Sequence, residues 1–119
     1  MQARLFSTRN SMQYGLKGET LQKITGIFAR YEEIESALLY GSRAKGNFRP
    51  GSDIDLTLVG QKLNLKLLNR ISLDLDDLLL PYTFDLSIYN HITNSNLIEH
   101  IERVGLIFYQ KSEKKEGVS

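Results

Sequence analysis

The sequence predicts one α+β domain (mixed α/β), in which a small mixed sheet is flanked by helices. Three observations lead to this prediction. The chain has 119 residues, which is enough for one hydrophobic core. Patterns typical of helices alternate along it with patterns typical of strands, in the order helix, strand, short helix, strand, helix, strand, helix and strand. The composition, 41% hydrophobic and 24% charged, is that of an ordinary globular domain.

The N-terminal part of the chain predicts a loose lead-in followed by a helix. Residues 1–17 are polar and have no sustained hydrophobic period, and Met12 among them could be an alternative start. The domain itself is predicted over residues 18–110. A helix over about 19–31 is indicated by apolar residues at helical spacing, namely Leu21, Ile24, Ile27, Phe28 and Tyr31.

Two strands and the connection between them form the centre of the pattern. Residues 34–40 end in an apolar run that is short enough for a buried strand. Residues 54–59 alternate between apolar and polar side chains, which predicts a strand with one buried face. The connection, 41–53, is rich in glycine and in basic residues, and its first two residues, Gly41 and Ser42, could open a short helix.

A stripe of leucines follows these strands. Leucines and an isoleucine at steps of three and four over residues 63–79 predict a helix that packs on the core and ends before Pro81. Three acids lie among the leucines: Asp74, Asp76 and Asp77. We interpret them as a solvated helix end rather than as a metal site.

The last part of the chain predicts a strand, a helix and a short strand. Residues 82–89 alternate again and predict a third strand. Asn94 or Ser95 can cap the helix that follows, and a last short strand is predicted over 106–109. Residues 111–119 are charged and are predicted to form a disordered tail.

The charge balance and the lack of cysteine exclude several kinds of protein. With 15 Lys and Arg against 14 Asp and Glu, the net charge is +1, so no broadly basic surface for direct nucleic-acid binding is expected. The chain has no cysteine, which excludes disulfides, cysteine zinc sites and thiol nucleophiles. The sequence contains no signal peptide and no apolar span of membrane length, so we expect a cytoplasmic protein without a membrane segment.

A pair of carboxylates beside the glycine-rich connection indicates metal and phosphate chemistry. Asp53 and Asp55 are two residues apart, so on a strand both side chains leave the same face, roughly 6.6 Å apart along the backbone. Unpaired backbone N–H groups at Gly41 and Ser42 would favour an anion such as phosphate. Two carboxylates repel each other unless a cation accompanies them, and magnesium binds carboxylate and phosphate oxygens. The alternative is a charged surface hairpin without a ligand.

Further polar residues extend this hypothesis. Asp85 lies on the non-core face of the third predicted strand and would join the pair if that strand is a neighbour. A third acid could hold a second metal or activate an attacking hydroxyl. Arg43 and Lys45 are either solvated loop charges or phosphate contacts. His91 and His100 have no metal-ligand spacing, and we interpret them as surface or capping residues.

A motif in this region resembles that of a known family. The run Gly41-Ser42-Arg43-Ala44-Lys45-Gly46, followed after five residues by Ser52-Asp53-Ile54-Asp55-Leu56, resembles the signature of the minimal nucleotidyltransferases of the DNA polymerase beta superfamily. The wider resemblance runs from the helix before the motif to Tyr109. It implies the nucleotidyltransferase fold, binding of a nucleoside triphosphate with magnesium, two ions in all, and transfer of a nucleotidyl group.

The resemblance also implies a role for each matching residue. Gly41 and Ser42 would hold triphosphate oxygens. Asp53 and Asp55 would coordinate magnesium, and Asp85 would be the third, catalytic acid. The position of Asp85 follows from the order and alternation of the predicted strands, because no local motif surrounds it.

The resemblance further implies a partner. Minimal nucleotidyltransferases are often paired with a small helical protein of the HEPN type, and some act as antitoxins that adenylylate a tyrosine of this partner, an RNase toxin. ATP would then be the AMP donor and a protein hydroxyl the acceptor. Two alternatives remain open: an antitoxin that acts by binding alone, and a homodimeric transferase that modifies a small molecule such as an antibiotic.

Overall fold

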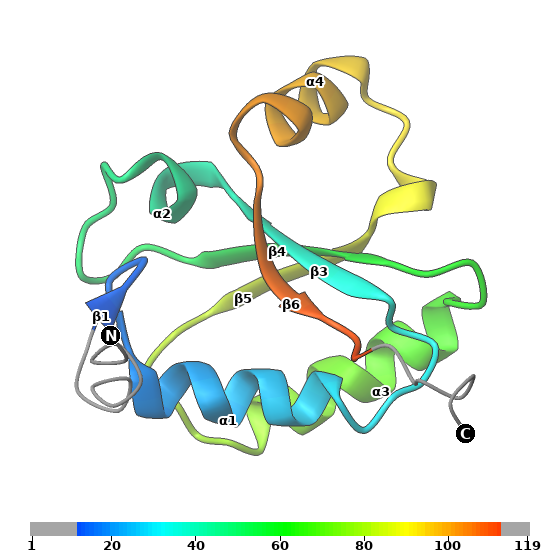
Figure 1. The fold of residues 1–119 in the computed structure, drawn as a ribbon, viewed down its shortest axis with the longest axis horizontal. Coiled ribbons are helices and arrows are strands. Elements are labelled where there is room, and N and C mark those ends of the chain that lie inside the picture. The colour runs from blue at the N-terminus through cyan, green and yellow to red at the C-terminus, as the bar shows by residue number, and fades with distance from the viewer. Residues whose placement is uncertain (1–11, 113–119) are drawn as a thin grey trace.

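Four strands form a mixed sheet at the centre of the molecule (Figure 1). The computed structural model describes residues 12–112. The strands are β3 (Ser36–Tyr40), β4 (Ile54–Val59), β5 (Phe84–Ile88) and β6 (Leu106–Gln110), in the spatial order β5-β4-β3-β6. β4 and β5 run parallel, whereas β3 pairs antiparallel with both β4 and β6. The predicted mixed sheet is therefore confirmed.

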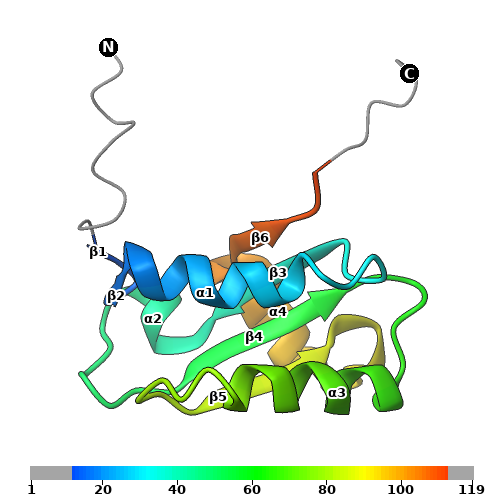
Figure 2. The ribbon, with the colours of Figure 1, turned by 90° about the horizontal axis from the view of Figure 1, so that it is seen from below.

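Helices lie on both sides of this sheet, as the sequence predicted (Figures 1 and 2). The helices are α1 (Gly18–Phe28), α2 (Gly41–Lys45), α3 (Leu65–Asp76) and α4 (Ser95–Val104), with a short 3₁₀ turn, η2 (Tyr89–His91), before α4. α1 and α3 cover one face, while α4 and the short α2 lie toward the other. The side of the sheet under α1 and α3 is therefore the covered one, and the side toward α2 and α4 can present polar side chains.

Local sequence signals explain where two of the helices begin. The side chain of Asn64 accepts a hydrogen bond from the N–H of Leu67 at 2.8 Å, which caps the start of α3. Asn94 caps α4 in the same way by accepting from the N–H of Leu97 at 3.1 Å. Asparagine is a favoured residue at this position because its oxygen pairs with a donor that the helix leaves free.

The first helix ends earlier than the sequence predicted. The pattern indicated a helix to residue 31, whereas α1 ends at Phe28. The N–H of Tyr31 donates to the carbonyl of Phe28 at 3.0 Å, three residues back, which is a tighter turn than an α-helix. Tyr31 still fits the apolar spacing because it packs against the core, and its hydroxyl hydrogen-bonds Asp74 at the end of α3.

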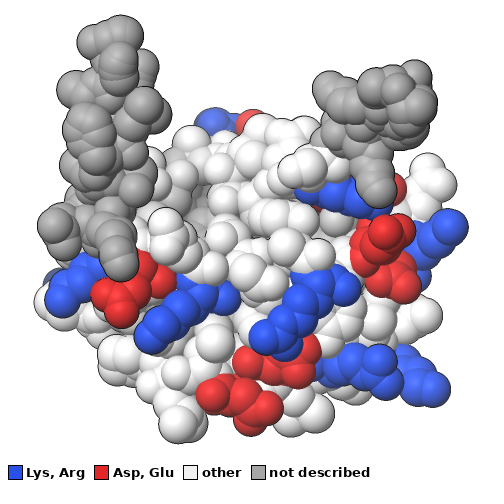
Figure 3. Space-filling model, turned by 60° about the horizontal axis from the view of Figure 1, so that its bottom comes forward, with Lys and Arg blue, Asp and Glu red and all other residues white. Residues whose placement is uncertain are grey.

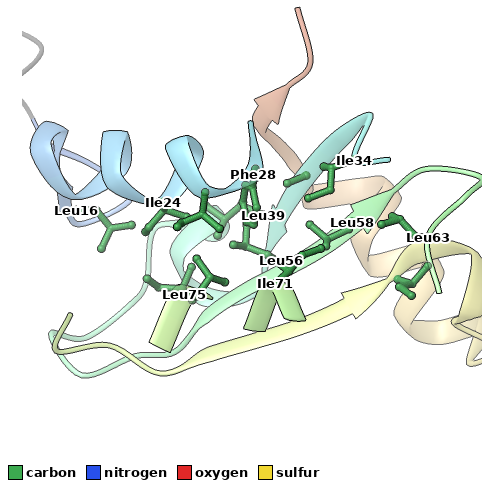
Figure 4. Packing of buried hydrophobic residues seen from close by; sticks show 14 residues of the cluster. Leu16, Ile24, Phe28, Ile34, Leu39, Leu56, Leu58, Leu63, Ile71 and Leu75 are labelled. Carbon is green, nitrogen blue, oxygen red and sulfur yellow. The ribbon is translucent and has the colours of Figure 1, made fainter. Parts of the chain in front are cut away.

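The hydrophobic core fills the space between the sheet and the helices α1 and α3 (Figure 4). Ile54, Leu56 and Leu58 of β4 are fully buried in it. Phe28 from α1 and Ile71 from α3 belong to the same cluster. Because successive side chains of a strand point to opposite faces, the residues that alternate with these three on β4 point away from the core. This alternation fixes the face on which the acids of the motif lie.

A short hairpin precedes α1. It consists of β1 (Met12–Gln13) and β2 (Leu16–Lys17), joined by Tyr14 and Gly15 with φ of 58° and 79°. Two positive φ values are typical of the type I′ turn that joins strands by two residues. Leu16 is fully buried in the core. Residues 12–17 therefore differ from the loose lead-in predicted over 1–17, because strands of two residues are too short to show a period, and residues 1–11 lie outside the described part of the chain.

The surface carries charges of both signs. Figure 3 shows Lys and Arg side by side with Asp and Glu on one face of the molecule, without a large area of one sign. In the part of the chain that the structure describes, no helix is both long and apolar enough to span a bilayer. The predicted disordered tail, 111–119, lies outside the described residues from position 113 onward.

Candidate active site

The second residue of each of the parallel strands β4 and β5 is an acid, and the strand pairing brings the two acids together. Asp55 is the register partner of Asp85, and both side chains point away from the core. Neighbouring strands lie about 4.8 Å apart, so these carboxylates are adjacent on one face of the sheet. Asp53 lies directly before β4 and is exposed, as is Asp85, whereas Asp55 is half-buried. The strands β4 and β5 are therefore neighbours, which is the condition under which Asp85 was expected to join the pair.

The charges of these acids act on one another. Burial, and then the negative charges of Asp85 and Asp53, raise the pKa of Asp55 to about 6, while the Arg43 guanidinium acts in the opposite direction. Both acids therefore lie close enough to Asp55 to influence its ionisation. The ion pairs found within residues 12–112 lie elsewhere on the molecule, so no Lys, Arg or His there forms an ion pair with these carboxylates.

The donor atoms suit a hard divalent cation such as Mg²⁺. Carboxylates that raise the pKa of a neighbour are stabilised when a cation accompanies them, and carboxylate oxygens are ligands that magnesium prefers. Across residues 12–112, however, no three acidic or histidine side chains are grouped closely enough to hold a metal ion as they stand. Asp53 and Asp85 are exposed side chains that can turn toward Asp55, so the three residues fit such an ion.

Gly41 brings the backbone of α2 against Asp55. Its φ is 76°, a left-handed conformation that favours glycine. A Cβ added at Gly41 would lie 3.2 Å from Cγ of Asp55 and would overlap its Oδ2 atom. The glycine is therefore required by both conformation and space, and it lets the start of α2 lie directly against Asp55.

His100 also contacts Gly41, and no pattern in the sequence predicted this contact. The N–H of Gly41 donates to Nε2 of His100 at 3.2 Å, and the imidazole lies edge-on to the ring of Tyr40, with 6.1 Å between the ring centroids. His100 therefore accepts a backbone hydrogen bond, which agrees with the interpretation as a capping residue. His91 is exposed in η2.

The contact of His100 leads to a stability prediction. His100→Ala should lower the free energy of unfolding by about 1 kcal/mol in the ligand-free protein, because Gly41 loses the acceptor of its N–H. Urea unfolding at neutral pH measures this change. His91→Ala is the matched control and should leave stability unchanged, since His91 is exposed. Equal stability of the two variants would contradict the role given to His100.

The other residues of the motif lie in different surroundings. Ser42 is half-buried and Lys45 is exposed, both on α2. Arg43 is 3% exposed, and its guanidinium donates to the backbone carbonyls of Tyr14, Pro50 and Ser52. Arg43 is thus engaged with the loop before β4, which differs from the solvated or phosphate-facing side chain that the sequence suggested.

A layer of polar side chains lies next to the acids. The hydroxyl of Ser87 donates to Thr57 Oγ1 at 2.9 Å, and Thr57 is fully buried. Tyr40 pairs in register with Asp55, and burial followed by the charge of Asp85 raises the pKa of its phenol, which therefore stays neutral. The strand alternation that predicted the face of Asp85 applies equally to Thr57 and Ser87, so that signal could have found them.

The pKa of Asp55 leads to a prediction about the metal-free protein. Aspartate in the unfolded chain titrates near 3.8, whereas the pKa of Asp55 in the folded protein is about 6. Between these values the folded protein holds a proton that the unfolded chain has released. The free energy of unfolding contributed by this group should therefore fall as the pH rises from about 4 to about 6 and then level off. Asp55→Asn should remove this fall.

Urea unfolding in the presence of EDTA, repeated across this pH range, measures the effect. Asp76→Asn removes an exposed acid on α3 and serves as the control, which should keep the pH dependence of the wild type. The prediction fails if Asp55→Asn and the wild type show the same dependence on pH.

The family described as polymerase beta, nucleotidyltransferase matches residues 22–114. A crystal structure of a toxin–antitoxin with AMP-PNP is 17% identical with a TM-score of 0.63, covering 82% of this chain and 78% of that one. The MntA–HepT toxin–antitoxin is 15% identical with a TM-score of 0.59, covering 80% and 74%. No curated protein sequence matches the chain.

A third similar structure is the tri-AMPylated Shewanella oneidensis HEPN toxin in complex with MNT antitoxin, 16% identical with a TM-score of 0.58, covering 78% of this chain and 71% of that one. At such identities the likeness shows the fold alone, and that fold is the one found in MntA-type antitoxins. The family match is broader evidence, because it includes the motif, β4 and β5. The chain therefore belongs to the polymerase beta nucleotidyltransferase family.

Proposed function

We propose that the chain transfers AMP from ATP to a tyrosine hydroxyl of a HEPN-type helical protein and acts as the antitoxin of that protein. The single observation that carries this proposal is the pairing of Asp55 with Asp85 on parallel strands, directly beside Gly41. The similar structures support it, since one contains AMP-PNP and another an AMPylated HEPN toxin. We further propose that the reaction takes place in the cytoplasm.

Each residue of the motif has a proposed task. Asp53 and Asp55 would hold magnesium, with Asp85 as a third ligand. When bound, the metal supplies positive charge that offsets the charge of the triphosphate. The backbone N–H of Ser42 would bind a phosphate oxygen, and the N–H of Gly41 would do so in place of its hydrogen bond to His100. Lys45 is an exposed cation on the same helix that would approach the triphosphate.

The proposed reaction is an in-line displacement at the α-phosphorus of ATP. The tyrosine oxygen forms a bond to the α-phosphorus while the bond from that phosphorus to the bridging oxygen of the β-phosphate breaks, and pyrophosphate leaves. The proton of the hydroxyl passes to the carboxylate of Asp85, which is exposed and therefore accessible to an acceptor. Alignment of the two substrates contributes much of the acceleration in such reactions.

A protein acceptor suits the surroundings of the acids. Asp53 and Asp85 are both exposed, so a folded partner can approach them directly. The net charge of +1 offers no broad attraction for RNA. A partner that docks over this face presents its tyrosine at high effective concentration, and the attached AMP adds charge and bulk to the partner.

Co-expression with a small helical protein of the HEPN type tests the proposal. Intact mass spectrometry of the purified partner should show the addition of one or more AMP groups, and the addition should be lost in the Asp53→Asn, Asp55→Asn double variant. Asp76→Asn on α3 is the control for removal of an acid and should keep the modification. If the double variant silences the partner equally well without a mass change, the chain acts by binding alone. Modification of an aminoglycoside instead would identify a small-molecule transferase.

A further inference from the structure

We propose that Arg43 is a positioning residue, which ties the loop before β4 and the N-terminal hairpin to the acid pair instead of binding phosphate. This inference rests on the proposed function for its kinetic readout only. Arg43 donates from Nη1 to the carbonyl of Tyr14 at 2.8 Å, and from Nε and Nη2 to the carbonyl of Ser52 at 3.2 and 2.9 Å. A longer contact of 3.5 Å joins Nη2 to Pro50.

Two aromatic rings also lie close to the same guanidinium. Its Cζ atom lies 5.2 Å from the ring centroid of Phe48 and 5.2 Å from that of Tyr82. The residue is only 3% exposed, so Arg43 presents almost no surface to a triphosphate. A phosphate oxygen would have to displace backbone carbonyls that are already paired, and breaking hydrogen bonds to a charged group is costly.

The segments that Arg43 joins lead directly to the acids. The carbonyl of Ser52 belongs to the peptide bond before Asp53, so its hydrogen bonds fix the entry to β4. Tyr82 lies three residues before Asp85 and stacks on the same guanidinium. Arg43 thus contacts the approaches to both strands of the acid pair, and its charge also acts directly on Asp55.

The hairpin of residues 12–17 packs closely against Arg43. Gly15 has φ of 79°, and a Cβ added there would lie 2.7 Å from Nη1 of Arg43 and would overlap the ring of Phe48. The hairpin precedes residues 22–114, the part that the family match covers. A segment outside the matched region therefore supports the loop that carries Asp53.

Hydrogen exchange in the absence of metal and nucleotide tests this role directly. Arg43→Lys keeps the positive charge but loses the planar guanidinium with its several N–H donors. Arg43→Met loses both the charge and the donors. In either variant the amides of residues 46–53 and 12–17 should exchange at least about tenfold faster, the factor expected when hydrogen bonds to a charged group are lost. Arg49→Met is the matched control, because Arg49 is exposed on the same loop. It should leave exchange unchanged.

Two further readouts separate positioning from general destabilisation. AMP transfer to the co-expressed partner should show a fall in kcat on the order of 10²-fold for Arg43→Lys, with the KM for ATP little changed, since misplacement of a reacting group lowers the rate of the chemical step. Mn²⁺ binding without nucleotide, measured by calorimetry, should weaken in parallel. Because Arg43→Met can lower stability as a whole, Tyr82→Leu provides a variant that keeps the arginine and removes one stacked ring, and it should loosen the loop in the same direction.

Unchanged exchange at residues 46–53, together with a rise in the KM for ATP, would overturn the proposal and make Arg43 a phosphate ligand. Absence of any AMP transfer by the wild type would overturn the proposed function but not this inference. The exchange measurement is made on the ligand-free protein, so it decides the role of Arg43 in either case.

Discussion

Asp55→Asn is expected to lower the rate of AMP transfer by a factor on the order of 10³, the size of effect seen when one group that stabilises charge in the transition state is removed. Asp55 is the central carboxylate, because it pairs in register with Asp85 and its pKa is raised by both Asp85 and Asp53. The amide keeps the shape of the side chain but removes the negative charge that would bind magnesium. Intact mass of the co-expressed partner and release of pyrophosphate from ATP measure the loss.

The same substitution should act on stability in the opposite direction. Above pH 6 the charged carboxylate of Asp55 is disfavoured by burial and by two neighbouring charges, so Asp55→Asn should stabilise the metal-free protein. A variant that is more stable and yet inactive cannot owe its inactivity to unfolding. Asp76→Asn on α3 should change neither property. Retention of most of the transfer rate by Asp55→Asn would exclude Asp55 from the reaction.

The positions of Asp55 and Asp85 show which part of the site an alternating strand pattern predicts and which part it does not. Alternation over residues 54–59 predicted the buried face correctly, because a strand has a period of two and any slip would expose Leu56. It also predicted the face of Asp85. The register that sets Asp85 beside Asp55 was not readable, since parallel pairing depends on long-range contacts rather than on local sequence.

The contacts of Arg43 and His100 could not be predicted from a pattern in the sequence. The carbonyls that Arg43 binds belong to residues up to 29 positions away, and their directions are set by a hairpin and a loop with no period. His100 lies 59 positions from Gly41 and meets it only because α4 packs beside α2. A motif therefore identified the acids and glycines that we propose for the chemistry, whereas the residues that hold them in place depend on tertiary structure.

Gly41→Ala should lower the rate of AMP transfer by a factor on the order of 10², although it removes no functional group. The new Cβ would lie 3.2 Å from Cγ of Asp55 and overlap Oδ2, so either the carboxylate or the start of α2 must move. Displacement of a reacting group by about 1 Å can cost on the order of 10²-fold in rate. The change thus tests whether contact between the backbone of α2 and Asp55 is a requirement of the site.

Gly46→Ala separates this contact from backbone strain. Gly46 ends α2 with φ of 90°, close to the 76° of Gly41, but a Cβ added at Gly46 would have no atom within 4 Å. Gly46→Ala should lose about 1–2 kcal/mol of stability, the cost of a left-handed conformation for alanine, and Gly41→Ala should lose at least as much. Only Gly41→Ala should also lose Mn²⁺ binding and AMP transfer. Equal activity of the two variants at a temperature where both are folded would mean that the approach of α2 to Asp55 does not matter for catalysis.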